Sequence, residues 1–433
     1  TSPLPPPKGL SSTAQGWAAL AGIARSAWLE PKKLATRIQK WQASWPDHPA
    51  NELIGQILAQ AQRSGQYPVK IALLLPLTGA YADQARAVED GLLAAYYRGT
   101  EPRPTVAIYD TRGSAQGARA AFAKARAGAA NFVVGPLVPT GVNAVAAMRP
   151  AVPVLALNYL NAGTRAPAHF FQFGLSPSQE ARSAAERAFA RGLERAVVLV
   201  PANGWGQRIG QAFTQRFEQL GGTVISSAVF QPGAVHFAAP LTALLGGAPA
   251  QAPAGATASG SVSTLASKSV PGGPQFVFFA ASSFDTAQLI VPQIAYYGGI
   301  GLPVYSISSV YQPGASANDL DGVNFPVMPW FVDSEASIAG LRQMLKTLYP
   351  NRWRNYATLY ALGYDAWRLI PLLGFNVNQP LAQPVLGVTG TLGLNANNVI
   401  KRRAEWAQYV NGKPRVAKPP VPGSIVSPAP ATR

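Results

Sequence analysis

Small polar and aromatic residues follow the ends of several predicted buried strands, where their side chains could hydrogen-bond a small ligand. They are Leu77, Thr78, Gly79, Gly135, Pro136, Leu137, Thr140, Asn158, Tyr159, Asn203, Trp205, Ser282, Ser283 and Tyr311. Open α/β sheets bind ligands at the carboxyl edge of their strands. Hydroxyls, amides and aromatic rings with hardly any charge suit a neutral polar or zwitterionic ligand better than a phosphate. The same residues could equally be turn residues around an empty cleft, so both interpretations stay open.

A glycine-rich turn at Gly204–Gly210 superficially resembles a dinucleotide-binding fingerprint. Three residues, Pro201–Asn203, separate this turn from its strand, and Trp205 would crowd a pyrophosphate. The next strand ends near Phe230 without the acid that would bind a ribose. We therefore predict no nucleotide and no other cofactor, and we interpret the segment as a βα turn whose Trp and Asn line a crevice.

No other motif predicts a catalytic or metal centre. Asp110 ends a strand, but the first βα turn lacks the required glycines, so we expect Asp110 to cap the turn that follows it. His48, His169 and His236 are isolated in the sequence and lack a second ligand at metal spacing, so we expect them in loops or at the surface. The chain has no Gly-x-Ser-x-Gly elbow, and we interpret the acid pairs Glu89–Asp90 and Asp319–Asp321 as solvated charge.

Alternating strand and helix signals begin at Val69 and predict the elements that must position these residues. The predicted strand Val69–Leu75 contains a short, unbroken apolar run, IALLL, and Pro76 and Gly79 end it, as in a buried parallel strand. Further strands are predicted at 106–110, 132–134, 154–157, 196–200, 223–230, 276–280 and 304–306, with helices between most of them. Such alternation with short loops predicts right-handed βαβ units, and the two series of elements predict two doubly wound lobes.

The segments outside this alternation have different compositions. Apolar residues around Trp17, Trp41 and Ile54 fit three short helices, which we interpret as the remnant of an α-helical repeat domain in residues 1–66. Residues 246–273 are almost purely small residues with a single charge, Lys268, and predict a mobile insertion. The Pro-rich residues 413–433 predict a disordered tail.

Composition narrows the classes of protein further. The chain of 433 residues carries 36 Lys and Arg against 19 Asp and Glu, a net charge of +17 that would attract an anionic surface. No long block of adjacent basic residues appears, so we expect no nucleic-acid partner. Zero cysteines exclude disulfides and thiolate sites. We find no signal peptide and no run of about 20 apolar residues, so we expect a soluble chain whose targeting signal or lipid site would lie upstream of Thr1.

Four segments, KIALLLPLTGAYADQARAVEDGLLAAYY, VVGPLVPTGV, PVLALNYL and VLVPANGWGQRIGQAF, resemble the type I periplasmic-binding fold, whose chain crosses between two lobes three times. We place the crossings near Pro167, Val327 and Val385. Residues 67–412 would then form this domain, with lobe 1 at about 69–166 and 328–384 and lobe 2 at about 169–326 and 386–412.

Three other segments, FFQFGLSPSQEA, GVTGTLGLNANNVIKRRAEWAQYVNG and WPDHPAN, are similar to the LppC or LpoA-type outer-membrane lipoproteins. That family activates penicillin-binding proteins. The resemblance implies a tetratricopeptide-like N-terminal domain, mostly missing here, and a lipid anchor on a cysteine absent from this chain. It also implies a location in the periplasm at the inner face of the outer membrane, and it supplies no catalytic residues. The insertion at 246–273 has no counterpart in the family pattern.

The resemblance thus implies a non-enzymatic, monomeric regulator of peptidoglycan synthesis. Its expected partner is a bifunctional, class A penicillin-binding protein, with peptidoglycan as a further contact that the positive charge would favour. The alternative is a periplasmic solute-binding protein that closes on an amino acid or similar polar molecule for an ABC transporter. A transport receptor usually begins at its binding fold, whereas here Trp-rich helices precede it.

Overall fold

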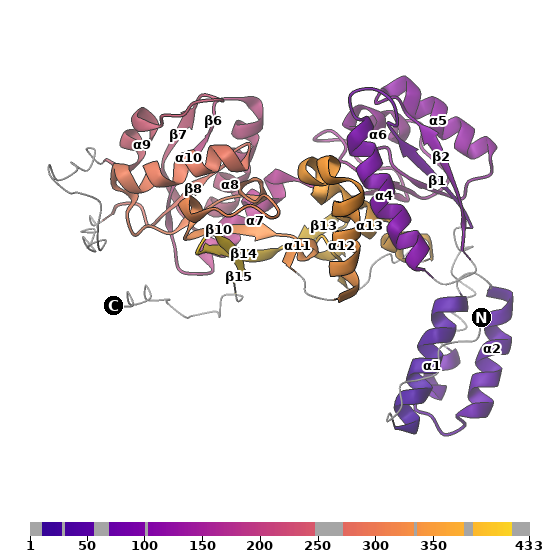
Figure 1. The fold of residues 1–433 in the computed structure, drawn as a ribbon. Coiled ribbons are helices and arrows are strands. Elements are labelled where there is room, and N and C mark those ends of the chain that lie inside the picture. Colours follow the sequence, from indigo (N-terminus) through magenta and orange to yellow (C-terminus); the bar gives the residue numbers. More distant parts are fainter. Residues whose placement is uncertain are drawn as a thin grey trace. The chain divides into compact units, whose positions relative to one another are not determined.

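The computed structural model describes residues 11–27, 31–55, 69–99, 103–246, 272–332, 336–375 and 384–417 (Figure 1). The chain divides into two compact units. The first is Thr1–Leu175 with Ala339–Lys401, and the second is Ser176–Ile338 with Arg402–Arg433. Each unit contains a sheet built mainly of parallel strands with helices between them, which confirms the predicted α/β class. Within the described ranges, no helix is long and apolar enough to cross a membrane.

The N-terminal helices, α1 (Ser12–Ala27), α2 (Pro31–Ser44) and the helical residues 51–55, pack around a small aromatic core. Trp41 is buried, and its indole Nε1 donates a 2.8 Å hydrogen bond to the carbonyl of Gly16. His48 is also buried, between the rings of Trp17 and Trp41, and its Nε2 lies 2.8 Å from the carbonyl oxygen of Thr13. His48 thus lies in a loop, as expected, but it is buried there and its imidazole joins the helices.

The first unit holds a five-stranded parallel sheet in the order β2-β1-β3-β4-β5. Its strands are β1 (Lys70–Leu75), β2 (Thr105–Asp110), β3 (Phe132–Val134), β4 (Val154–Ala156) and β5 (Phe170–Gln172). Its helices are α4 (Ala82–Arg98), α5 (Ala115–Ala127), α6 (Pro139–Ala146), α12 (Ala336–Leu348) and α13 (Pro350–Phe375). The first residues of α12 belong to the second unit. Alternate residues of β1 point to opposite faces of the sheet, and each face is covered by a different set of helices. Leu73 and Leu75 join a cluster with α4 and α13, whereas Ala72 and Leu74 join one with α5 and α6. Both faces of the sheet are therefore covered, as its continuous apolar strands predict.

The second unit holds a seven-stranded sheet in the order β15-β14-β10-β9-β8-β6-β7. Its strands are β6 (Arg195–Pro201), β7 (Thr223–Phe230), β8 (Phe276–Phe279), β9 (Val304–Tyr305), β10 (Val323–Val327), β14 (Glu405–Val410) and β15 (Lys413–Val416). Its helical elements are α7 (Pro177–Phe189), α8 (Gly204–Gln219), α9 (Ala238–Leu245), α10 (Phe284–Ile294), η1 (Ala295–Gly299), η2 (Ser308–Val310), η3 (Asn318–Leu320) and α11 (Pro329–Val332). Among these seven strands, β14 is antiparallel to both of its neighbours, β10 and β15, and all other neighbouring strands are parallel.

The crossings between the units lie later in the chain than the sequence predicted. Strand β5 pairs with β4 and belongs to the first unit, although we expected the second lobe to begin at His169. A small sheet of β11 (Val385–Leu386), β12 (Thr391–Leu394) and β13 (Ile400–Arg403) also lies mostly in the first unit. Leu392 and Ile400 pack into that unit's core, and the buried Asp365 carboxylate accepts hydrogen bonds from Val388 and Thr389. These contacts move the third crossing from Val385 to the junction of residues 401 and 402.

The first residues of the predicted disordered tail form a strand instead. Lys413–Val416 forms β15, which pairs antiparallel with β14. Asn411 and Gly412 make the connecting turn with positive φ angles of 52° and 69°, and their amides donate to the Asp321 carboxylate at 3.0 and 2.8 Å. The remainder of the tail, 418–433, and most of the predicted insertion, 247–271, lie outside the described residues.

Candidate functional site

The carboxyl end of β1 is joined to that of β2 by Asp110. The Asp110 carboxylate accepts hydrogen bonds from the Thr78 hydroxyl at 2.6 Å and from the backbone amide of Leu77 at 2.9 Å. It also accepts from the Arg112 amide at 2.8 Å, which confirms that Asp110 caps the following turn. Burial acts to raise the pKa of Asp110, but these hydrogen bonds outweigh it and leave the pKa below its ordinary value.

The lowered pKa of Asp110 predicts a pH-dependent contribution to stability. A carboxyl whose pKa is lower in the folded state stabilises the fold above its unfolded pKa, and the benefit is lost as the pH falls through its folded pKa. We expect Asp110→Asn to cost about 1 kcal/mol at pH 7. The difference from the unmodified chain should shrink below about pH 4. Urea unfolding at pH 7, 4 and 3 measures this, with the exposed Asp319→Asn as control. A difference that stays constant over this range would contradict it.

A glycine and two side-chain hydrogen bonds shape the carboxyl ends of β3 and β4. Gly135 has a φ of 100°, and a side chain there would collide with the carbonyl of Leu74, so only glycine fits. The Asn158 side chain donates to the Leu137 carbonyl at 3.0 Å, and the Tyr159 hydroxyl donates to the Gly174 carbonyl at 2.7 Å. Two of the predicted polar side chains thus form hydrogen bonds that shape the edge itself.

In the second unit, two predicted residues cap helices. The Asn203 side chain accepts from the amide of Gly206 at 2.8 Å, and Ser283 accepts from Thr286 at 3.2 Å. This confirms a βα turn at Asn203. Trp205 is half-buried in the first turn of α8, and the Tyr311 ring stacks on Phe325 with ring centroids 5.9 Å apart. The capping oxygens are committed to the fold, so a ligand here would contact mainly the exposed Ser282, the aromatic rings and backbone groups.

The predicted residues therefore fall into two groups, each on the carboxyl edge of its own sheet. Nine of them, Leu77, Thr78, Gly79, Gly135, Pro136, Leu137, Thr140, Asn158 and Tyr159, lie in the first unit. The other five, Asn203, Trp205, Ser282, Ser283 and Tyr311, lie in the second. Their joining in one ligand-binding cleft stays a prediction.

Sequence reasoning missed a buried ionic cluster at this edge of the second unit. Glu180, in the first turn of α7, pairs with Arg402 at 2.6 Å, and their side chains are 8% and 3% exposed. The same carboxylate accepts from the backbone amide and the hydroxyl of Ser308 at 3.0 and 2.7 Å. Ser176 caps α7 and so fixes the start of the helix that carries Glu180, but nothing local in the sequence indicated Arg402.

Of the four acids interpreted as solvated charge, Asp319 is exposed as expected, whereas the other three are structural. Glu89 is buried and pairs with Arg86 at 2.8 Å. Asp90 pairs with Arg352 at 2.8 Å; burial raises the pKa of Asp90, although the Arg352 guanidinium opposes that shift. Asp321 holds the turn before β15. Among the described residues, no three His, Cys, Asp or Glu side chains lie close enough together to hold a metal ion.

The sequence and the fold of this chain are both similar to those of known proteins. The model of the family described as "LppC putative lipoprotein" matches residues 11–412. The "Penicillin-binding protein activator LpoA" of Yersinia pestis is 29% identical, and the match covers 92% of this chain and 68% of the relative. The solved C-domain of Haemophilus influenzae LpoA, "a regulator of PBP1A", is 25% identical with a TM-score of 0.64 and covers 81% of this chain and 100% of that domain.

The fold alone is also shared with a transport protein. A structure from Chromobacterium violaceum described as a "putative branched-chain amino acid ABC transporter" is 23% identical, with a TM-score of 0.59. It covers 79% of this chain and 100% of its own.

Proposed function

This chain belongs to the LppC lipoprotein family, and from that premise we propose that it activates a bifunctional, class A penicillin-binding protein and so regulates peptidoglycan synthesis. The observation that carries the proposal is the extent of the family match, which includes the N-terminal helices as well as both α/β units. We further propose that the chain acts in the periplasm, attached to the outer membrane through a lipid, and that its partner performs the chemistry. The N-terminal helices would then be part of a tetratricopeptide-like domain.

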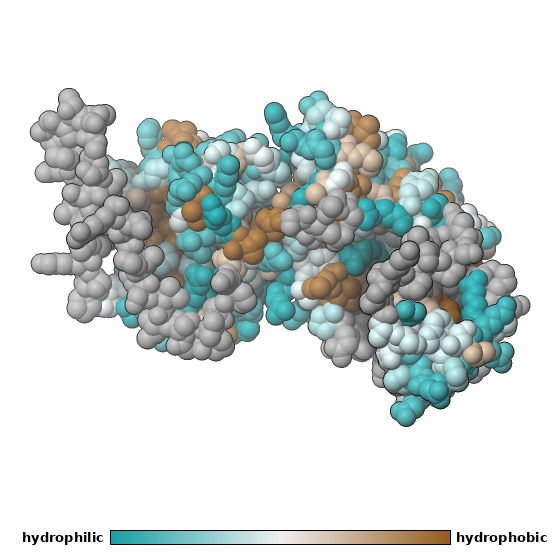
Figure 2. Space-filling model, turned by 60° about the horizontal axis from the view of Figure 1, so that its bottom comes forward, coloured by the Kyte–Doolittle hydropathy of each residue, from teal (hydrophilic) through white to brown (hydrophobic). Residues whose placement is uncertain are grey.

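Activation without catalysis requires that the chain bind the active conformation of its partner more tightly than the inactive one. A surface for that contact is not evident from hydropathy. Figure 2 shows apolar residues in small, separate patches among hydrophilic ones on the face drawn there. Individually exposed apolar side chains, such as Leu348 at 59% and Leu386 at 77%, are common on soluble proteins and do not by themselves mark an interface.

The test is the rate of peptide cross-linking by a purified class A penicillin-binding protein with increasing amounts of this chain. We expect a saturable increase in the transpeptidase rate. A transport receptor of the same fold serves as the control, because it shares the architecture without the family relationship. A parallel thermal-shift screen with amino acids tests the solute-binding alternative, since a ligand at about 100 times its Kd adds roughly 2.7 kcal/mol of stability. Saturable stabilisation by an amino acid, with no effect on the synthase, would overturn the proposal.

A further inference from the structure

A depression of about 760 Å³ lies on the first unit, away from the residues predicted from the strand ends. It is lined by Asn143, Ala146, Ala147, Arg149, Pro150, Ala151, Thr164, Arg165, Ala166, Pro167, Ala168 and His169, and we call it the cationic basin. These residues come from the end of α6 and from the loops that precede β4 and β5. The basin therefore lies at the amino-terminal ends of those strands, opposite the carboxyl edge. Its volume is within the range of small-molecule sites.

The charge of the basin is positive. Its lining includes two arginines and a histidine but no aspartate or glutamate. Both arginine side chains are exposed, and within the described part of the chain neither guanidinium makes a hydrogen bond or ion pair. The carbonyls of the last turn of α6 do not engage them, because those of Asn143, Val145 and Ala146 accept the amides of residues 147, 148 and 149. Arg149 and Arg165 are thus available for an anion.

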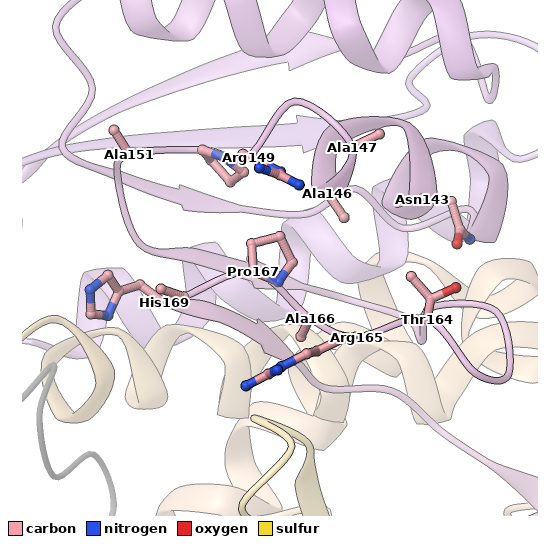
Figure 3. A pocket seen from close by; sticks show the side chains of 12 residues that line it. Asn143, Ala146, Ala147, Arg149, Ala151, Thr164, Arg165, Ala166, Pro167 and His169 are labelled. Carbon is pink, nitrogen blue, oxygen red and sulfur yellow. The ribbon is translucent and has the colours of Figure 1, made fainter.

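The cationic basin is elongated. In Figure 3, Asn143 and Thr164 face each other at one end, His169 lies at the other, and Arg149 and Arg165 come from opposite walls. The Asn143 amide donates to the carbonyl of Pro139 at 2.7 Å and to Asn161 at 3.3 Å, so it supports the wall. Between the ends the surface consists of alanine methyls and proline rings. Such a surface can accept small aliphatic groups.

We infer that the cationic basin binds a short, alanine-rich peptide with free carboxylates. Guanidinium groups bind carboxylates with paired, charge-assisted hydrogen bonds, and two arginines on opposite walls suit two carboxylates along one extended ligand. The alanine and proline surface between the arginines suits the methyl groups of the peptide. The identity of this peptide as the stem peptide of peptidoglycan rests on the proposed function, and the net charge of +17 would favour approach to such an anionic polymer.

Calorimetric titration of the full chain tests the inference. The probe is a synthetic tetrapeptide of L-alanine, D-glutamate, a diamino acid and D-alanine, and its fully amidated form is the negative control. We expect Arg149→Gln and Arg165→Gln each to raise the Kd by about tenfold, because each removes a charge-assisted pair. Arg208→Gln, at an exposed position on α8 in the second unit, removes the same charge and should change the Kd less than twofold. Melting temperatures should stay unchanged, since all three side chains are exposed.

Three results would overturn the inference. They are equal binding by the amidated peptide, equal loss of affinity in Arg208→Gln, and binding of inorganic phosphate as tight as that of the peptide. The last two would indicate general attraction by net charge or an unspecific anion site. The cross-linking assay separates this inference from the proposed function. Absence of peptide binding by a chain that still stimulates the synthase would refute the basin alone. Peptide binding by a chain that leaves the synthase unaffected would refute the activator function alone.

Discussion

Arg402→Met is expected to lower the free energy of unfolding of the second unit by about 3–5 kcal/mol. The substitution leaves the Glu180 carboxylate, 8% exposed, with the hydrogen bonds of Ser308 but without its cation. An isolated buried charge is costly because water can no longer solvate it. The pair joins the start of α7 to the segment leading into β14, two parts of the chain 222 residues apart. The loss should therefore destabilise the edge of the sheet as well as the pair itself.

Urea unfolding of the full chain, with hydrogen exchange of the β14 amides to identify the second unit, measures this effect. Arg216→Met is the matched control, because it removes the same group from the Arg216–Glu186 pair, whose side chains are 35% and 49% exposed. Water screens that pair, so we expect a loss below about 1 kcal/mol. The double variant Glu180→Gln with Arg402→Met should recover much of the stability, since no buried charge remains. Equal losses in Arg402→Met and Arg216→Met would show that the Glu180 site is solvated in solution.

The Glu180–Arg402 pair joins residues far apart in the chain, and it marks the limit of what the sequence could predict. Most strands and helices from Val69 to Ser306 were predictable because burial on both faces of a parallel sheet produces short, continuous apolar runs separated by helical periodicity. The strand-end positions of the candidate site followed from the same rule. The partners of Glu180 and Asp90 did not, because ion pairing between residues far apart leaves no local pattern. The burial of His48 was not predictable for the same reason, since it depends on how Trp17 and Trp41 pack around the imidazole.

The third crossing between the units and the start of the tail were predicted wrongly, each for a different reason. The third crossing was placed too early because β11 to β13 are strands of two to four residues, too short to show a hydrophobic period. Their assignment depends on contacts of Leu392 and Ile400 with a core assembled from other parts of the chain. The start of the tail, in contrast, had a usable signal. Asn-Gly at 411–412 is a strong indicator of a β-hairpin, and it stood directly before the Pro-rich composition that suggested disorder.

Close packing of α4 against α13 gives the second large expected effect. A side chain at Gly363 would collide with the backbone carbonyl of Val88, and one at Gly91 would collide with that of Tyr360. The two glycines thus allow the helix backbones to touch, and neither obstacle is a flexible side chain that could rotate away. Gly363→Ala should therefore force the helices apart and cost about 3 kcal/mol of unfolding free energy in the first unit. This cost exceeds the gain of about 1 kcal/mol that alanine normally brings to a helix.

Gly340 on α12 provides the control with the opposite sign. A methyl group at Gly340 would have no atom within 4 Å, so Gly340→Ala should stabilise the chain by up to about 1 kcal/mol through helix propensity alone. Urea unfolding of both variants decides between packing and propensity, since the same chemical change should give opposite shifts at the two positions. A neutral or stabilising Gly363→Ala would show that the helices can separate at little cost. In that case the core formed by Val88, Leu92, Leu362 and Ile370 would not depend on their close approach.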